Sequence, residues 1–121
     1  MLANSGEFAT MSGRSAQAKG RRAEIELAQY LRDNGYTAAR PGTPLNYGTE
    51  ADITGVQGIH IECKRHEKLE INKWYEQAAA DAEKMQDGKP VVIFRQNRRP
   101  WMIVLSLSDF LELQGGAKNG S

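Results

Sequence analysis

The sequence predicts an α/β domain in which helices pack against a mixed central β-sheet. Apolar residues recur at helical spacing in two segments, residues 19–33 and 70–85. Several short runs between and after these segments have the alternating or continuous apolar pattern of strands. The predicted order of elements is α–β–β–β–α–β–β–α. With 121 residues, the chain is long enough for one domain with a hydrophobic core.

Both ends of the chain have a composition typical of flexible segments. Residues 1–18 are small, polar and rich in Gly and Ser. Met11 could be the native start, which would make the residues before it an added leader. The tail at residues 114–121, QGGAKNGS, has the same character. The folded domain is therefore expected over residues 19–113.

In the first half of the domain, the helix should run from about Lys19 to Asp33 and end at the turn sequence DNGY. A short strand is expected at residues 36–40, followed by the Pro- and Gly-rich loop PGTPLNYGTE. Residues 51–56 and 58–65 are interpreted as two strands joined by a tight turn.

In the second half, a helix should cover about Glu70 to Met85, because apolar side chains, Trp74 and Tyr75 among them, recur there at helical spacing. These two aromatic residues are expected in the core or at a dimer contact. The runs VVIF and WMIVLSL predict two strands buried on both faces. Ser108 could cap a short final helix, SDFLEL.

The composition narrows the class of protein. No apolar run approaches the roughly 20 residues that span a bilayer, and no basic-then-apolar signal segment is visible. The single cysteine, Cys63, excludes an internal disulfide and suits a reducing compartment. We therefore expect a cytoplasmic protein without a membrane partner, in the host cytoplasm if the gene is carried by a phage.

The formal net charge of +1 does not by itself indicate a nucleic-acid partner, so the distribution of charge matters more. The basic residues gather in three clusters. If these clusters converge in the fold, they would form a positive surface around an acidic centre; otherwise they are three unrelated solvated groups. The clusters are Lys19, Arg21 and Arg22; Lys64, Arg65 and Lys68; and Arg95, Arg98 and Arg99.

The segment HIECKR, residues 60–65, combines a strand pattern with charged residues. Side chains alternate between the two faces of a strand, so apolar and polar residues separate here. The carboxylate and the ammonium group of the polar face stand side by side, as a solvated ion pair or as a catalytic pair. Ile59, Ile61 and Cys63 form the apolar face, and His60, Glu62 and Lys64 form the polar face, where His60 could contact a substrate.

Asp52 strengthens the catalytic interpretation. Taken alone, an Asp at the start of a strand is commonly turn chemistry, and an exposed Glu62–Lys64 pair would contribute little stability. A tight hairpin, however, would bring Asp52 next to Glu62, and clustered carboxylates repel unless a cation holds them. Carboxylate oxygens are the ligands that Mg²⁺ or Mn²⁺ prefers. Lys64 could then orient water or stabilise the transition state of phosphoryl transfer.

Glu24 lies on or beside the apolar stripe of the first helix, with Leu27, Ala28 and Leu31 at its helical neighbours, whereas Glu26 lies on a polar face. A carboxylate directed toward a core needs a partner. That partner could be Arg21 or Lys19 of the same helix, or Glu24 could lie at the edge of the apolar stripe.

The pattern resembles the PD-(D/E)XK nuclease superfamily. Its signature is an acidic residue that opens one strand and a (D/E)-X-K motif on the next strand. Asp52 and the segment Glu62-Cys63-Lys64 occupy these places, with TEAD where Pro-Asp is common, and KGRRAEIELAQYLRDNGY carries the helix glutamate Glu24. The resemblance implies a restriction-endonuclease-like α-β-β-β-α-β core. The segment KGRRAEIELAQYLRDNGY is similar to the start of archaeal-type Holliday junction resolvases and their phage relatives.

The resemblance implies roles for these residues. Asp52 and Glu62 would bind Mg²⁺, for which Mn²⁺ could substitute, with the backbone carbonyl of Cys63 as a further ligand. Lys64 would be the catalytic lysine, and Glu24 would act in the outer shell or on a second metal ion. Gln77 matches a glutamine often found on the second helix of the superfamily, although it could also be a polar residue flanking a buried helix face.

The predicted function is therefore a homodimeric, Mg²⁺-dependent endonuclease that cuts branched DNA, as a Holliday junction resolvase does in DNA recombination, without a small-molecule cofactor. The alternatives are a related nuclease acting on flaps, nicks or other DNA structures, and a catalytically silent DNA-binding module of the same fold. Tyr47 could stack on an unpaired base or pack locally. The candidate DNA-binding residues are Lys19, Arg21, Arg22, Tyr47, Arg65, Arg95, Arg98 and Arg99.

Overall fold

The fold is described from a computed structural model, and the described residues are 19–38 and 52–116. The expected flexible segment 1–18, the whole Pro- and Gly-rich loop with Tyr47, and the last residues of the expected tail lie outside the described residues.

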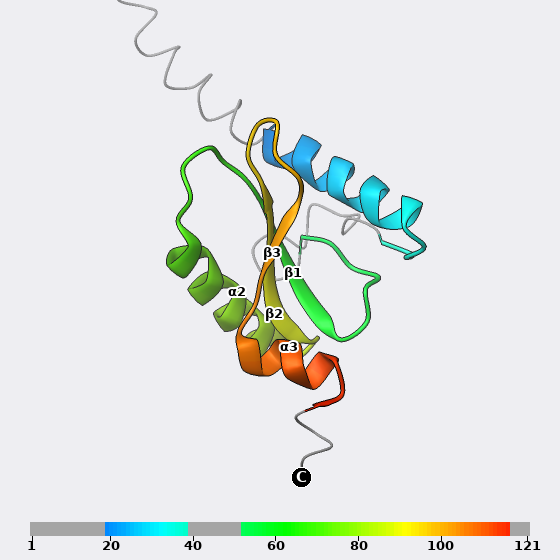
Figure 1. Ribbon diagram of the computed structural model, residues 1–121, viewed down its shortest axis with the longest axis vertical. Coiled ribbons are helices and arrows are strands. Elements are labelled where there is room, and N and C mark those ends of the chain that lie inside the picture. Colours follow the sequence, from blue (N-terminus) through cyan, green and yellow to red (C-terminus); the bar gives the residue numbers. More distant parts are fainter. Residues whose placement is uncertain (1–18, 39–51, 117–121) are drawn as a thin grey trace, which may run out of the picture.

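A three-stranded sheet forms the centre of the domain, in the order β1–β2–β3. β1 (Ile59–Arg65) pairs in parallel with β2 (Lys89–Arg95), and β2 pairs antiparallel with β3 (Met102–Val104). The helix α2 (Ile71–Met85) connects the two parallel strands, as a parallel pair requires a crossover. α3 (Leu107–Leu113) follows β3 (Figure 1).

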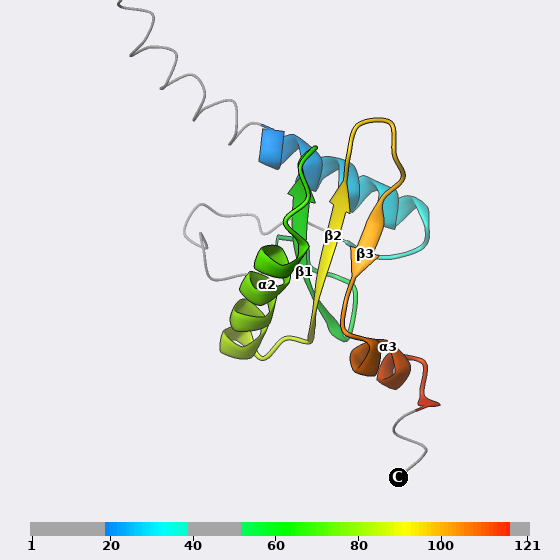
Figure 2. The same ribbon diagram turned by 60° about the vertical axis from the view of Figure 1, so that its left-hand side comes forward.

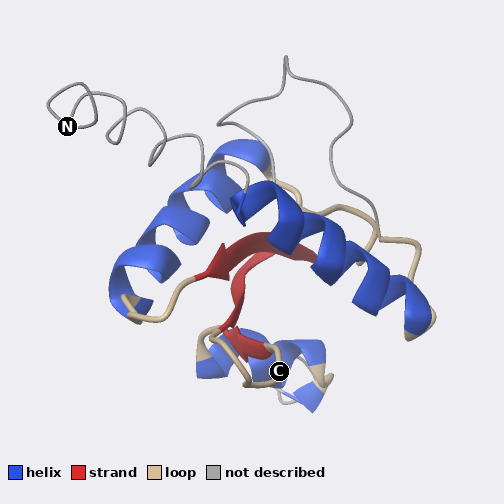
Figure 3. Ribbon diagram, turned by 90° about the horizontal axis from the view of Figure 1, so that it is seen from above, coloured by secondary structure: helices blue, strands red, loops and turns tan. Residues whose placement is uncertain are grey.

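Helices cover the two faces of the sheet. The N-terminal helix, residues 19–33, lies on one face, and α2 lies on the other (Figures 2 and 3). Each face has its own buried cluster, and Val91 and Val92, neighbours on β2, belong to opposite clusters. The cluster under the N-terminal helix includes Leu27, Ala28, Ile61, Cys63 and Val91, and the cluster under α2 comprises Trp74, Ala78, Val92 and Phe94.

A tight turn between α2 and β2 packs against the start of β1. α2 ends at Gln86 in the left-handed conformation (φ 54°), and Gly88 follows with φ 145°. A Cβ atom on Gly88 would lie 2.7 Å from the backbone of Gly58 and Ile59, closer than a side chain tolerates. The absence of a side chain at residue 88 therefore allows this turn, including Asp87, to lie directly against β1.

Most of the predicted elements are confirmed, and four differ in detail. Among its described residues, the expected strand at 51–56 is reduced to isolated bridge positions at Ile53 and Thr54, and Ile53 pairs antiparallel with Ile61 of β1. Residues 36–38 have no regular structure, so the described part of the strand expected at 36–40 is not a strand. The two segments contact each other at Gly55 (φ 97°), which lies so close to the backbone of Thr37 that a side chain at residue 55 would clash with it.

The other two differences concern the C-terminal part. β3 is shorter than predicted, and Met102 and Ile103 are 49% and 51% exposed, so this strand is not buried on both faces. It is an edge strand, and the helices that cover the sheet pack over β1 and β2. The cap of the last helix is Ser106 rather than Ser108: its hydroxyl accepts a hydrogen bond from the Asp109 N–H at 3.1 Å. Ser108 already lies within the first turn.

No helix among the described residues has both the length and the apolar character that crossing a membrane requires.

Candidate active site

One pocket of about 430 Å³ brings together all five residues that the sequence predicts to be catalytic. The residues come from three elements that are distant in the sequence: the start of the N-terminal helix, β1 with the segment bridged to it, and the middle of α2. The carboxyl end of β1 lies next to the beginning of the N-terminal helix (Figure 2), and residues of both elements line the pocket. The five residues are Glu24, Asp52, Glu62, Lys64 and Gln77.

Two backbone-directed hydrogen bonds fix Asp52 against β1. Its N–H donates to the Ile61 carbonyl at 2.9 Å, and its Oδ2 accepts from the Cys63 N–H at 2.7 Å. Burial raises the pKa of Asp52 to about 6, with a further contribution from the nearby Glu24 carboxylate. The Asp52 carboxylate is therefore held rigidly, and its negative charge is poorly solvated.

Glu62 is more deeply placed, between β1 and α2. Only 4% of its surface is exposed, and its Oε2 lies 3.1 Å from Nε2 of His60. Burial raises the pKa of Glu62 to about 7, and the charges of Asp52 and Asp81 add to this increase. Two buried carboxylates that repel each other gain free energy when a cation comes between them, so the donor set fits a divalent metal ion.

Besides the predicted metal ligands Asp52 and Glu62, other side chains in this region could hold a metal ion. One ligand atom from each of His60, Glu62 and Asp81 lies within 4.8 Å of the other two. Oxygen ligands from carboxylates favour Mg²⁺ or Mn²⁺, whereas an imidazole nitrogen favours transition metals. This group of residues thus provides a possible acidic metal site, and Glu62 is common to it and to the predicted pair.

Lys64 lies on the same face of β1 as Glu62 but closer to the surface. Its Nζ donates a hydrogen bond to Oε1 of Gln77 on α2 at 3.3 Å. The ammonium group is also near enough to Asp52 to oppose the increase in the pKa of that carboxyl group. Gln77 thus contacts the predicted lysine directly.

His60 differs from the expectation that it could contact a substrate. The structure buries it completely, with both ring nitrogens hydrogen-bonded to carboxylates: Nε2 to Glu62, and Nδ1 to the two oxygens of Asp87 at 2.9 and 3.0 Å. It cannot reach a substrate because α2 covers this part of the polar face of β1. Sequence reasoning missed Asp81 and Asp87. Asp81 could have been found, because it lies one helical turn after Gln77 on the same face of α2.

Cys63 is buried, as its place on the apolar face of β1 predicts. Burial raises the pKa of its thiol, which keeps the sulfur protonated and unreactive.

Two of the three basic clusters converge beside the pocket. Lys19 and Arg65 line it, and together with Arg22 they line an adjoining pocket of about 490 Å³. Arg65 also donates to Oδ1 of Asn97 at 3.0 Å, which ties β1 to the loop between β2 and β3. The acidic centre therefore has a basic rim, as expected if the clusters met in the fold.

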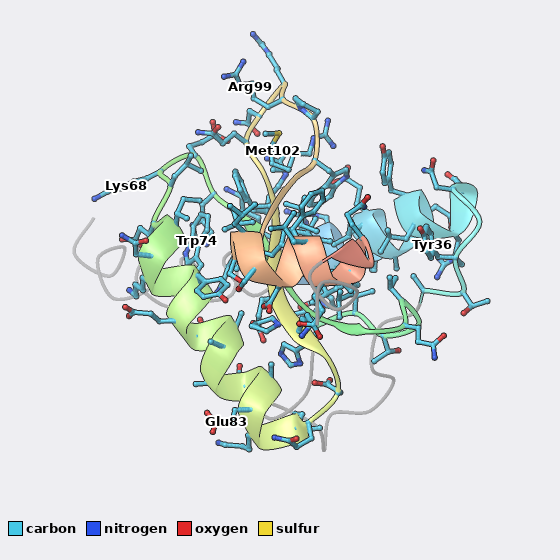
Figure 4. All side chains as sticks on the ribbon, turned by 60° about the horizontal axis from the view of Figure 1, so that its bottom comes forward. Tyr36, Lys68, Trp74, Glu83, Arg99 and Met102 are labelled. Atoms are coloured by element: carbon cyan, nitrogen blue, oxygen red, sulfur yellow. The ribbon has the colours of Figure 1, made fainter. Side chains whose placement is uncertain are left out.

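In the third basic cluster, Arg95 is already engaged in contacts within the protein, whereas Arg98 and Arg99 are exposed. Arg95 pairs with Glu26 at 3.5 Å, lies over the ring of Trp101 and donates to the Arg99 carbonyl, and it lines a different pocket. Arg21, Arg98 and Arg99 are exposed. Figure 4 shows Arg99 and Lys68 projecting from two neighbouring loops, away from the body of the domain.

Comparisons with known proteins identify a family and a similar fold. A family described as "Phage putative PDDEXK endonuclease" matches residues 15–118. Among solved structures, Hjc, a Holliday junction resolvase from the archaeal hyperthermophile Archaeoglobus fulgidus, is similar with a TM-score of 0.54 and 20% sequence identity, over 81% of this chain and 97% of that chain. No curated protein matches the sequence.

At this identity, the likeness to Hjc concerns the fold, and it confirms the predicted restriction-endonuclease-like α/β class. The match to the family covers most of the sequence, including every described candidate residue. The chain therefore belongs to the family of phage PD-(D/E)XK endonucleases and is a nuclease of that superfamily.

Proposed function

We propose that this nuclease is a metal-dependent endonuclease that hydrolyses phosphodiester bonds in branched DNA, with four-way Holliday junctions as its substrate. The observation that carries the proposal is the convergence of Glu24, Asp52, Glu62, Lys64 and Gln77 on one pocket with a basic rim. The choice of a junction rests on the similarity in fold to a protein described as a Holliday junction resolvase.

In this proposal, Asp52 and Glu62 hold the divalent cation, and the carbonyl of Cys63 adds a ligand. Mg²⁺ is the expected ion and Mn²⁺ its substitute, because the donors are oxygen atoms. The bound cation would neutralise charge at the scissile phosphate and activate water. The hydrogen bonds from the backbone to Asp52 and between His60 and Glu62 support this role, because they fix both carboxylates before the cation arrives.

Lys64 acts on the reacting groups. Its ammonium group orients the attacking water or stabilises the negative charge that develops on the phosphate. Gln77 restricts the position of the ammonium group through their hydrogen bond. Glu24 lies farther from the chemistry, where it acts through the outer shell or on a second metal ion. Its electrostatic effect on Asp52 is consistent with that place.

The basic rim binds the DNA backbone. Lys19, Arg22 and Arg65 are positioned to contact phosphates next to the pocket, and the exposed Arg21, Arg98 and Arg99 would extend that contact. Such contacts hold the DNA without reading its sequence, as an enzyme selective for DNA shape requires. For a nuclease of a phage family, the host cytoplasm is the proposed site of action.

We propose that the second copy of the chain docks through β3 and α3. The acidic side chains of α3, Asp109 and Glu112, point back to Lys89 on β2, at 3.6 and 3.2 Å. The apolar side chains of α3 are exposed to solvent, next to the edge strand β3. A four-way junction has two-fold symmetry, and paired cuts need two active sites, so a symmetric dimer fits this substrate. The exposed apolar residues of β3 and α3 are Met102, Ile103, Leu107, Phe110, Leu111 and Leu113.

The test is cleavage of labelled four-way junction, flap and plain duplex DNA, each with Mg²⁺ or with EDTA, beside the variant Glu62→Gln. We expect symmetric paired cuts in the junction alone, which disappear with EDTA and in the variant. Metal-dependent cuts in the flap or duplex instead would refute the junction as substrate and retain the nuclease. Firm DNA binding without cuts in Mg²⁺ or Mn²⁺ would identify a silent binding module.

A further inference from the structure

Two consecutive hydrogen-bonded contacts connect the turn after α2 to the proposed metal ligand Glu62. The Asp87 carboxylate contacts Nδ1 of His60 through both oxygens, at 2.9 and 3.0 Å. On the other side of the ring, Nε2 of His60 lies 3.1 Å from Oε2 of Glu62. His60 is completely buried, whereas 35% of the Asp87 side chain is exposed and Asp87 does not line the pocket. Asp87 can therefore affect the pocket through His60.

The two contacts leave the imidazole ring one orientation. Each contact needs a proton between nitrogen and oxygen, and each uses a different ring nitrogen. A ring rotated by half a turn would place carbon atoms opposite the carboxylates and lose both hydrogen bonds. The ring orientation is consequently fixed at one side by Asp87, and the ring in turn fixes Oε2 of Glu62.

The backbone explains why these three residues meet. His60 and Glu62 are two positions apart on β1 and therefore share a face. Asp87 reaches that face because the turn at Gly88 packs against Gly58 and Ile59. α2 then covers His60, so water does not compete for its hydrogen bonds.

We propose that His60 and Asp87 are positioning residues for the metal ligand Glu62. Asp87 fixes the His60 ring, and His60 holds the Glu62 carboxylate in the orientation that binds a divalent cation. This inference rests on the proposed function, in which Glu62 is a metal ligand. Partners of this kind usually change metal affinity by about 10–100-fold when they are removed.

The test is calorimetric titration of the metal-free protein with Mn²⁺ in the absence of DNA, with thermal denaturation to verify that each variant is folded. We expect Asp87→Ala to weaken Mn²⁺ binding by about tenfold, as the loss of an outer-shell partner does. Asp87→Asn should stay near the wild-type affinity, because the amide oxygen still accepts the Nδ1–H hydrogen bond. His60→Gln should weaken binding at least as much as Asp87→Ala.

Glu83→Gln is the matched control, because Glu83 is an exposed acidic residue of α2 one turn before Asp87. It removes a nearby charge without touching His60, and Mn²⁺ affinity should not change. If Asp87→Asn binds Mn²⁺ as weakly as Asp87→Ala, charge and not orientation is responsible, and the positioning role is refuted. The loss of one whole equivalent of Mn²⁺ in His60→Gln would also overturn it, because His60 would then be a ligand.

Glu62→Gln separates this inference from the proposed function. If Glu62→Gln leaves Mn²⁺ binding intact, Glu62 is not a ligand and the site assignment fails. If Glu62→Gln weakens binding but Asp87→Ala does not, the site assignment stands and the positioning role alone fails.

Discussion

Replacing Asp52 with asparagine should stabilise the metal-free protein at neutral and alkaline pH. Burial raises the pKa of Asp52 from 3.8 to about 6 in the folded state. Between these two values the folded protein retains a proton that the unfolded chain has released, so the free energy of unfolding falls as the pH rises through this range. A difference of about two pKa units corresponds to about 3 kcal/mol at about 1.4 kcal/mol per unit. The asparagine side chain of the variant carries no charge and escapes this cost, while its amide oxygen still accepts the Cys63 N–H.

The assay is urea unfolding in EDTA, followed by the fluorescence of the buried Trp74, at about pH 4, 6 and 8. We expect Asp52→Asn to exceed the wild type by up to about 3 kcal/mol at the highest pH and to match it near pH 4. Asp33→Asn, an exposed acid of the N-terminal helix, serves as the control. Saturating Mg²⁺ should stabilise the wild type and leave the variant unchanged. An equal difference at all three pH values, or a less stable variant at high pH, would refute the electrostatic reasoning.

The remaining predictions concern chemistry, DNA binding, assembly and the turn after α2. Lys64→Ala should abolish cleavage while Mn²⁺ binding measured by calorimetry persists; residual full activity would remove the lysine from the mechanism. Arg65→Ala should weaken binding to junction and duplex DNA alike and lower the slope of log affinity against log salt by about one, whereas a selective loss for one DNA would indicate shape recognition. If the chain forms the proposed dimer, Phe110→Glu should make it a monomer in light scattering without lowering the melting temperature, and an unchanged dimer would exclude the α3 surface. Gly88→Ala should lower the free energy of unfolding by more than about 1 kcal/mol in urea titrations, and an unaffected variant would mean that the turn adapts.

The sequence was sufficient to predict the helices, and the five residues that it proposes as catalytic line one pocket. Helical periodicity identifies residues 19–33 and α2 because each helix buries one stripe, and that stripe is visible in the sequence. Strand alternation places Glu62 and Lys64 on one face of β1 for the same kind of reason. The meeting of Glu24 with Asp52 at one pocket could be anticipated only because the resemblance to the superfamily supplied the three-dimensional arrangement.

Alternation shows which side chains share a face, but not what later covers that face. His60 was therefore expected beside a substrate, although α2 buries it. The same limit explains β3: the apolar run around Ile103 predicts burial on both sides, whereas its place at the sheet edge leaves it half exposed. Asp87 has no signal in the sequence, because its position depends on how closely the turn at Gly88 approaches β1.

The two faces of β1 serve different purposes: Ile61 and Cys63 belong to the core, and Glu62 and Lys64 belong to the pocket. A substitution on the core face should therefore change mainly stability, and a substitution on the pocket face should change mainly the chemistry of the site. The insertion or deletion of a single residue inside the strand would exchange the faces, sending carboxylate and ammonium groups into the core and aliphatic groups into the pocket. Folding and activity would then be lost in one step. Over evolutionary time, the length of this strand should be held constant while its individual side chains vary within their own face.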